Sequence, residues 1–175
     1  ITNALEFPAR IKKGYIVPDV ENDILKIVVV NRYRQAPVAV GFIKNFGLKE
    51  GAIASSVAHD SHNIIAVGCD DESLAKAINL VIEAKGGVSA IQDDKTTFLL
   101  ALPIAGLMSD EDGYEVARQY TAIDDFVKKI LKSSLTSPFM TLSFMALLVI
   151  PSLKMSDLGI FDGRSFNFTK YYFEN

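Results

Sequence analysis

Both histidines of this 175-residue chain lie in one short segment, together with other side chains that can carry chemistry. His59, Asp60, His62 and Asn63 fall within five consecutive positions, and Ser61 stands among them. Two imidazoles and a carboxylate can supply nitrogen and oxygen ligands to iron, manganese or zinc. The same groups can transfer a proton, with Asp60 orienting one imidazole, or hydrogen-bond a polar heterocycle. The alternative without function is a polar loop whose side chains bond their own backbone.

The backbone of this segment decides which of its side chains can meet. On an extended chain, Asp60 and His62 point to one side and His59 points to the other. All three converge on one metal ion only if the segment turns. We therefore treat His59, Asp60 and His62 as a candidate ancillary metal site, and His59–Asn63 as a candidate binding loop. Spacing alone does not decide between these functions and a purely structural loop.

Strands are expected on both sides of this segment, and loops at strand ends are frequent positions for binding sites. Residues 24–30 are apolar except for Lys26 and mostly β-branched, which indicates a strand buried on both faces. Further strands are expected at 38–42, 52–57, 63–68, 88–92 and 97–102, the last two joined by a turn at 93–95. Residues 1–23 are expected to be a lead-in segment with one strand, followed by a single domain over 24–175.

Two main helices are expected over about 70–86 and 109–132. Asp70 or Asp71 can cap the first helix, and Gly86 suits its end. Ser109 opens the second helix in this interpretation, with apolar residues recurring at steps of four and three after it. The sequence therefore predicts an α+β fold, with a mixed sheet packed against two helices.

Composition excludes several classes of protein. With 18 basic and 21 acidic residues the net charge is 18 − 21 = −3, which argues against a nucleic-acid binder. A single cysteine, Cys69, suits a reducing compartment, and no secretory signal opens the chain, so we expect a cytoplasmic protein. The most apolar segment, 139–150, is shorter than the roughly 20 residues of a spanning helix and is expected in the core, away from any membrane.

Other reactive side chains give weaker signals. We expect Cys69 to be packed and inert, because the histidines lie in another segment. Arg32 and Arg34 follow the first buried strand and could bind an anion, although surface ion pairs are the more ordinary use. A serine hydrolase using Ser55, Ser56 or Ser61 is disfavoured, since the members of a catalytic triad normally come from separate segments.

Several long motifs of this chain resemble the C-terminal domain of bacterial-type adenine deaminases, in the amidohydrolase superfamily. They occur in matching order from about residue 24 to residue 168. The motifs are Lys26–Tyr33, Ala39–Phe42, Gly51–Asn63, Leu102–Ser109 and Pro138–Phe144. Several motifs in register are far more specific than the histidine spacing alone.

The resemblance implies the hydrolytic deamination of adenine to hypoxanthine and ammonia. It also implies manganese or iron held in a (β/α) barrel N-terminal to this domain. Such barrels use a His-x-His pair with further histidine and aspartate ligands, whereas this chain has two histidines spaced His-x-x-His. A barrel also typically needs about 250 residues. The chain is therefore not a (β/α)8 barrel, and is either an excised fragment or a stand-alone relative.

In the full-length enzyme, the resemblance implies adenine, the N-terminal barrel and further copies of the chain in a homo-oligomer as partners. We expect His59–Asn63 to reach the mouth of the barrel as a lid or pocket wall, and the isolated chain to be inactive. The alternative is a stand-alone module that binds a small ligand or a metal without catalysis.

Overall fold

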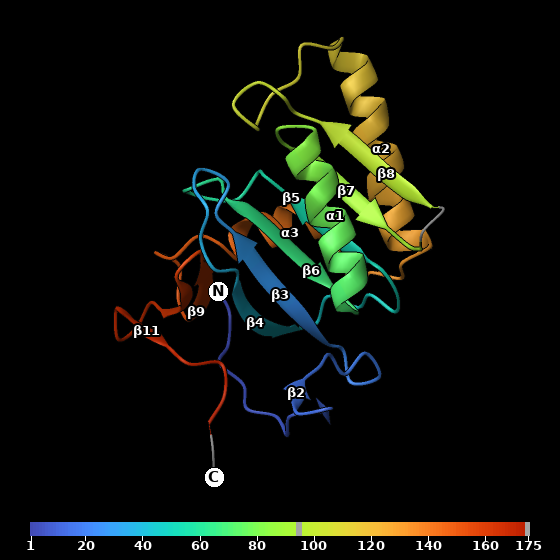
Figure 1. Ribbon diagram of the computed structural model, residues 1–175. Helices are drawn as coiled ribbons and strands as arrows, with labels where there is room; N and C mark the ends of the chain where they lie inside the picture. The colour runs from blue at the N-terminus through green and yellow to red at the C-terminus, as the bar shows by residue number, and fades with distance from the viewer. Residues whose placement is uncertain (94–95, 174–175) are drawn as a thin grey trace.

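The computed structural model describes residues 1–93 and 96–173, and its centre is a six-stranded sheet (Figure 1). The strands follow the order β4-β3-β6-β5-β7-β8, and every described pair in this sheet is antiparallel. They are β3 (Ile24–Val30), β4 (Ala39–Lys44), β5 (Ala52–Ser55), β6 (Ile64–Gly68), β7 (Gly87–Ile91) and β8 (Thr97–Ala101). The α+β class is confirmed, although the sheet expected to be mixed is antiparallel. In the turn expected at 93–95, positions 94 and 95 lie outside the described residues.

Helices cover both faces of this sheet. The helix α1 (Asp71–Glu83) lies on one face, in front of the sheet in Figure 1. The helices α2 (Gly113–Lys129) and α3 (Pro138–Phe144) lie on the other face. Successive side chains of β5 point to opposite faces of the sheet. Ala52 and Ala54 pack in the apolar cluster beneath α1, whereas Ile53 packs in the apolar cluster beneath α2 and α3. The strands therefore read as continuous apolar runs because both of their faces are buried.

The two expected helices are present with shorter bounds. Asp70 caps α1, since its carboxylate accepts a hydrogen bond from the amide of Ser73 at 2.7 Å. The cap of α2 is Asp112 instead of Ser109, because the Asp112 carboxylate accepts from the amides of Tyr114 and Glu115. A carboxylate is the better cap here because it also interacts favourably with the positive end of the helix.

Two smaller sheets complete the chain. The hairpin β1 (Ile11–Lys12) and β2 (Tyr15–Ile16) lies in the lead-in segment. The strands β9 (Leu153–Ser156), β10 (Gly159–Asp162) and β11 (Asn167–Thr169) form a three-stranded sheet in the order β11-β10-β9. This sheet packs against β4, where the side chains of Met155 and Ile160 lie over Gly41. Among the described residues, no helix is both long and apolar enough to span a membrane.

Candidate functional site

The two histidines lie in the connection between β5 and β6, residues 56–63, which we call the histidine loop. Both ends of this loop are buried: Ser56 is 0 % exposed and Asn63 is 3 % exposed. Asp60 and Ser61 at its tip are exposed, and the two imidazoles are half-buried. A loop with a buried base and an exposed tip can hold its side chains in place while presenting them to a ligand.

The structure brings the two imidazoles together. The ring centroids of His59 and His62 are 5.7 Å apart with an edge-on arrangement. His59 also packs against Phe144 of α3, with ring centroids 5.1 Å apart. Phe144 is 37 % exposed, so this ring forms an apolar border beside the histidines. The segment thus turns, which brings the two imidazoles together. The turn places their polar nitrogens beside the aromatic ring of Phe144.

The imidazole of His62 is held by the backbone of its own loop. Its Nδ1 accepts a hydrogen bond from the amide of Ala58 at 3.2 Å, and its own amide donates to the carbonyl of Ala58 at 2.7 Å. Burial lowers the pKa of His62 below its ordinary value, and electrostatic interactions with His59 and Arg32 lower this pKa further, against a smaller opposite effect of Asp60. His62 is therefore a neutral imidazole near neutral pH, with its Nδ1 lone pair already in use.

No set of metal ligands is found at the histidine loop among the described residues. Within residues 1–93 and 96–173, the structure holds no group of three or more His, Cys, Asp or Glu side chains that could bind a metal ion. His59 and His62 are adjacent, but Asp60 does not complete a set with them. Nδ1 of His62 accepts from the amide of Ala58, so this nitrogen is already in use, and an ancillary metal site at His59, Asp60 and His62 stays a prediction. Binding through hydrogen bonds is the chemistry that this arrangement supports.

Arg32 holds the histidine loop from outside, a role that its residue type does not reveal. Its Nε donates to the carbonyl of His62 at 2.6 Å, and its Nη2 donates to the carbonyl of Ala105 at 2.6 Å. The hydroxyl of Tyr33 donates to the carbonyl of Ser61 at 2.8 Å. The expected surface ion pair of Arg32 is thus replaced by bonds to backbone carbonyls. The only available signal was the position of Arg32 within the motif Lys26–Tyr33.

Comparison with known proteins agrees with the motifs. The family model described as adenine deaminase C-terminal domain matches residues 1–167. The chain belongs to this family. The match includes the lead-in segment, and the domain boundary at residue 24 stays a prediction.

Similar proteins named adenine deaminase occur in bacteria and archaea. The adenine deaminase of Sulfurovum sp. is 61 % identical over 146 residues, which are 83 % of this chain and 27 % of that protein. That of Parabacteroides distasonis is 52 % identical over 172 residues, 98 % of this chain and 31 % of the relative. That of Methanosarcina acetivorans is 52 % identical over 170 residues, which are 97 % of this chain and 30 % of that protein. The chain spans about three tenths of the length of these relatives.

Ser56 joins three segments at the base of the histidine loop of this adenine deaminase C-terminal domain. Its Oγ accepts a hydrogen bond from the amide of Gly87 at 2.8 Å and donates to the carbonyl of Gly106 at 2.6 Å. The amide of Ser56 donates to the carbonyl of Gly87 at 3.0 Å. Ser56 is therefore a structural residue that ties the histidine loop to Gly87 and Gly106.

We predict that Ser56→Ala lowers the free energy of unfolding of the domain by about 2 kcal/mol, because it leaves the Gly87 amide and the Gly106 carbonyl without their buried partner. Urea denaturation followed by circular dichroism measures the change. Ser137→Ala is the matched control, since Ser137 is exposed and its side chain makes no capping bond to α3. Equal free energies of unfolding for the two variants would contradict the assignment.

Cys69 has the inert character expected for it. Burial raises the pKa of its thiol to about 12, and its Sγ lies 3.5 Å from the carbonyl of Leu48. A thiol with such a pKa is almost entirely protonated at neutral pH, so it is a poor nucleophile and a poor metal ligand.

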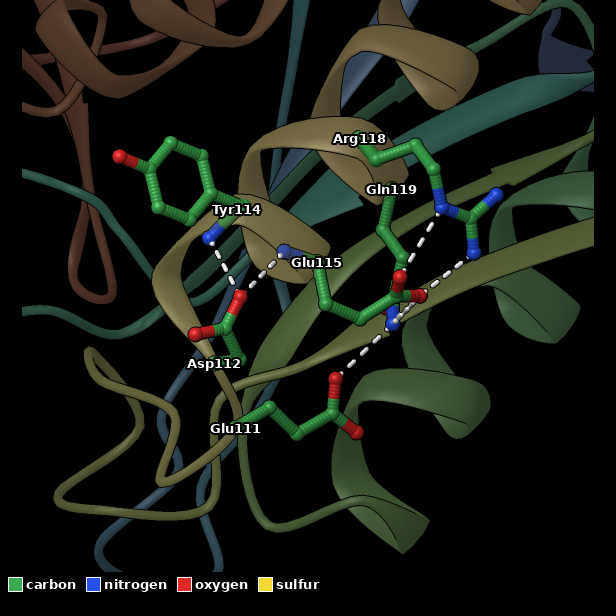
Figure 2. Close-up of polar contacts among 6 residues, drawn as sticks. All are labelled: Glu111, Asp112, Tyr114, Glu115, Arg118 and Gln119. Atoms are coloured by element: carbon green, nitrogen blue, oxygen red, sulfur yellow. Dashed lines mark hydrogen bonds and ion pairs between the residues drawn. The ribbon is translucent and has the colours of Figure 1, made fainter.

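A second polar cluster, at the start of α2, has a structural explanation (Figure 2). Arg118 donates to both carboxylate oxygens of Glu115, at 2.9 and 2.5 Å, and these bonds lower the pKa of Glu115 to about 2. Gln119 bridges Glu115 and Glu111 with hydrogen bonds of 2.9 Å. A hollow of about 240 Å³ lies beside this cluster, between α2 and β8. The polar atoms of the cluster face one another, so we assign the cluster to helix stabilisation.

Proposed function

We propose that this chain is the C-terminal domain of an enzyme that deaminates adenine to hypoxanthine and ammonia. In this proposal the histidine loop forms a wall of the adenine pocket, whose catalytic centre lies in an N-terminal part of the enzyme. The manganese or iron of the reaction belongs to that part, because the side chains described here do not form a metal-ligand set. The chain alone is inactive.

The lengths of the relatives support a division of labour between two parts of the polypeptide. Relatives named adenine deaminase are more than three times as long as the region they share with this chain. The family is described as a C-terminal domain. The catalytic residues that this chain lacks therefore have ample room in the preceding part of such a protein.

One observation supports this proposal most directly: the two histidines lie together at the exposed side of a loop whose base is buried. His59 and His62 are adjacent, half-buried and fixed through Phe144, Ala58 and Arg32. A purine has a polar edge of ring nitrogens and two apolar faces, and a pocket for it needs a few fixed polar groups among apolar ones. The imidazoles and the Phe144 ring offer this combination.

The proposal is tested in a chimera in which this chain replaces the matched segment of the Sulfurovum adenine deaminase, which is 61 % identical to it. We predict that His59→Ala and His62→Ala each lower kcat/KM for adenine by roughly 10- to 100-fold, because each removes a group that orients the substrate. Spectrophotometric assays of the conversion to hypoxanthine measure this loss.

Thermal stability and bound metal are measured on the same variants. A loss of activity with unchanged melting temperature and metal content supports a pocket wall. Wild-type kinetics in both variants would refute it, since the histidine loop would then lie away from the substrate.

A further inference from the structure

A second loop lies beside the histidine loop and shares its supports. This is the turn Ile104–Met108, in which the amide of Ile104 donates to the carbonyl of Met108 at 3.0 Å. Ile104 is 43 % exposed and Met108 is 56 % exposed, although the backbone of the turn is firmly bonded. The turn therefore presents apolar side chains from a fixed backbone, and its carbonyls accept hydrogen bonds from Arg32, which also bonds the histidine loop, and from Ser56 of that loop.

Arg32 is bonded to both loops. Its guanidinium donates to the carbonyl of His62 through Nε and to the carbonyl of Ala105 through Nη2, both at 2.6 Å. The guanidinium carbon lies 4.7 Å from the ring centroid of Tyr33, whose hydroxyl donates to the carbonyl of Ser61. Because the guanidinium is planar and its donors have fixed directions, these bonds determine the spacing between the two carbonyls.

Gly106 shows how closely the turn approaches Arg32. A Cβ at position 106 would lie 2.4 Å from Nη1 of Arg32, and Gly106 has a φ of +76°, which favours glycine. The carbonyl of Gly106 also accepts the hydroxyl of Ser56 at 2.6 Å. The turn is therefore fixed between the guanidinium on one side and the base of the histidine loop on the other.

We propose that Arg32 is a positioning residue for adenine deamination. It fixes the distance between His62 and the turn Ile104–Met108, so that the two loops form one surface with a polar edge and an apolar face. The occupant of this surface is the purine base, whose ring nitrogens and ring face match these two parts. The inference rests on the proposed function, and it adds the turn and Arg32 to the pocket wall.

Substitutions of Arg32 test the inference in the same chimera. Arg32→Ala is expected to lower kcat and kcat/KM together by roughly 10- to 100-fold, since a displacement of the wall weakens contacts in the transition state. Arg32→Lys is expected to restore little activity, because one ammonium cannot reproduce the planar set of donors. Arg34→Ala is the matched control: Arg34 is an exposed guanidinium on the same segment, and its loss is expected to leave the kinetics unchanged.

A double-mutant cycle with Gly106→Ala separates positioning from general destabilisation. The new methyl group displaces the guanidinium, so Gly106→Ala is expected to lower kcat/KM by about as much as Arg32→Ala. In the Arg32→Ala background the same change is expected to have at most about a twofold further effect. The backbone strain at a φ of +76° is present in both backgrounds and cancels in the cycle. Losses that multiply would show that Gly106 and Arg32 act independently of each other.

The outcomes distinguish this inference from the proposed function. If the His59 and His62 variants lose activity while the Arg32 variants do not, Arg32 has no positioning role and the pocket wall stands. If none of these variants changes the kinetics, the proposed function fails first. Full activity of Arg32→Lys, or losses that multiply in the cycle, would also overturn the role of Arg32. If Arg32→Ala does not fold, Tyr33→Phe supplies the test. It removes the hydroxyl that donates to the carbonyl of Ser61 and accepts from Nη2 of Arg32 at 3.1 Å, and it is expected to lower kcat/KM by about two- to fivefold.

Discussion

The 175-residue chain, purified by itself, is expected to give no measurable deamination of adenine, even with added Mn²⁺ or Fe²⁺. Displacement of an aromatic amine by water needs an activated water molecule, which a metal ion supplies in many hydrolases. The part of the chain that the structure describes contains no set of side chains to hold such an ion. The imidazole of His62 accepts a hydrogen bond from the amide of Ala58, and the imidazole of His59 packs against His62 and Phe144. Release of ammonia and the absorbance change from adenine to hypoxanthine both measure the expected absence of turnover.

The control for this experiment is the chimera with the Sulfurovum adenine deaminase, which is expected to be active. Activity of the chimera shows that the chain folds into a functional domain, so inactivity of the chain alone then reflects missing catalytic groups. Calorimetry on the isolated chain tests the alternative of a stand-alone module. Binding of adenine or Mn²⁺ by the chain alone would favour such a module. Turnover that scales with the concentration of the chain and disappears in His62→Ala would refute the division between two parts.

Local signals in the sequence predicted most of the elements but not their arrangement. The apolar run 24–30 and the cap at Asp70 identified β3 and α1, because a buried strand and a helix start depend on neighbouring residues. The pairing of β3 with β6 is a contact between distant segments, and the sequence of one chain does not encode it locally. The antiparallel direction of the sheet was missed for the same reason. The start of α2 was placed three residues early, since Ser109 and Asp112 are both good capping residues.

The candidate site was predicted by residue type, and its supports were not. His59 and His62 stood out because imidazoles are rare in this chain and carry chemistry. Arg32 and Ser56 bind backbone carbonyls and amides of distant segments. Every residue has such backbone groups, so no side-chain pattern marks the partner in advance. The ancillary metal site stays a prediction, and spacing could not show that Nδ1 of His62 faces the amide of Ala58.

Gly51→Ala is expected to lower the free energy of unfolding of the domain by about 3 kcal/mol or more. Gly51 has a φ of +71°, where a side chain costs roughly 1–2 kcal/mol. Its added Cβ would also lie 1.9 Å from the carbonyl oxygen of Ile91, so the backbone must move, which typically costs about 1–3 kcal/mol. Urea denaturation monitored by circular dichroism measures the difference.

Gly113→Ala is the matched control, because a Cβ at position 113 meets nothing within 4 Å and the residue begins α2. Alanine there is expected to leave stability unchanged or raise it by up to about 1 kcal/mol. Equal stability of the two variants would show that the contact between Gly51 and Ile91 is not formed in solution. The strain at Gly51 acts at the start of β5, which leads directly into the histidine loop. In the chimera, Gly51→Ala is therefore expected to reduce the amount of folded enzyme. His62→Ala, by contrast, is expected to lower kcat/KM of enzyme that remains folded. A titration of active sites separates the two effects.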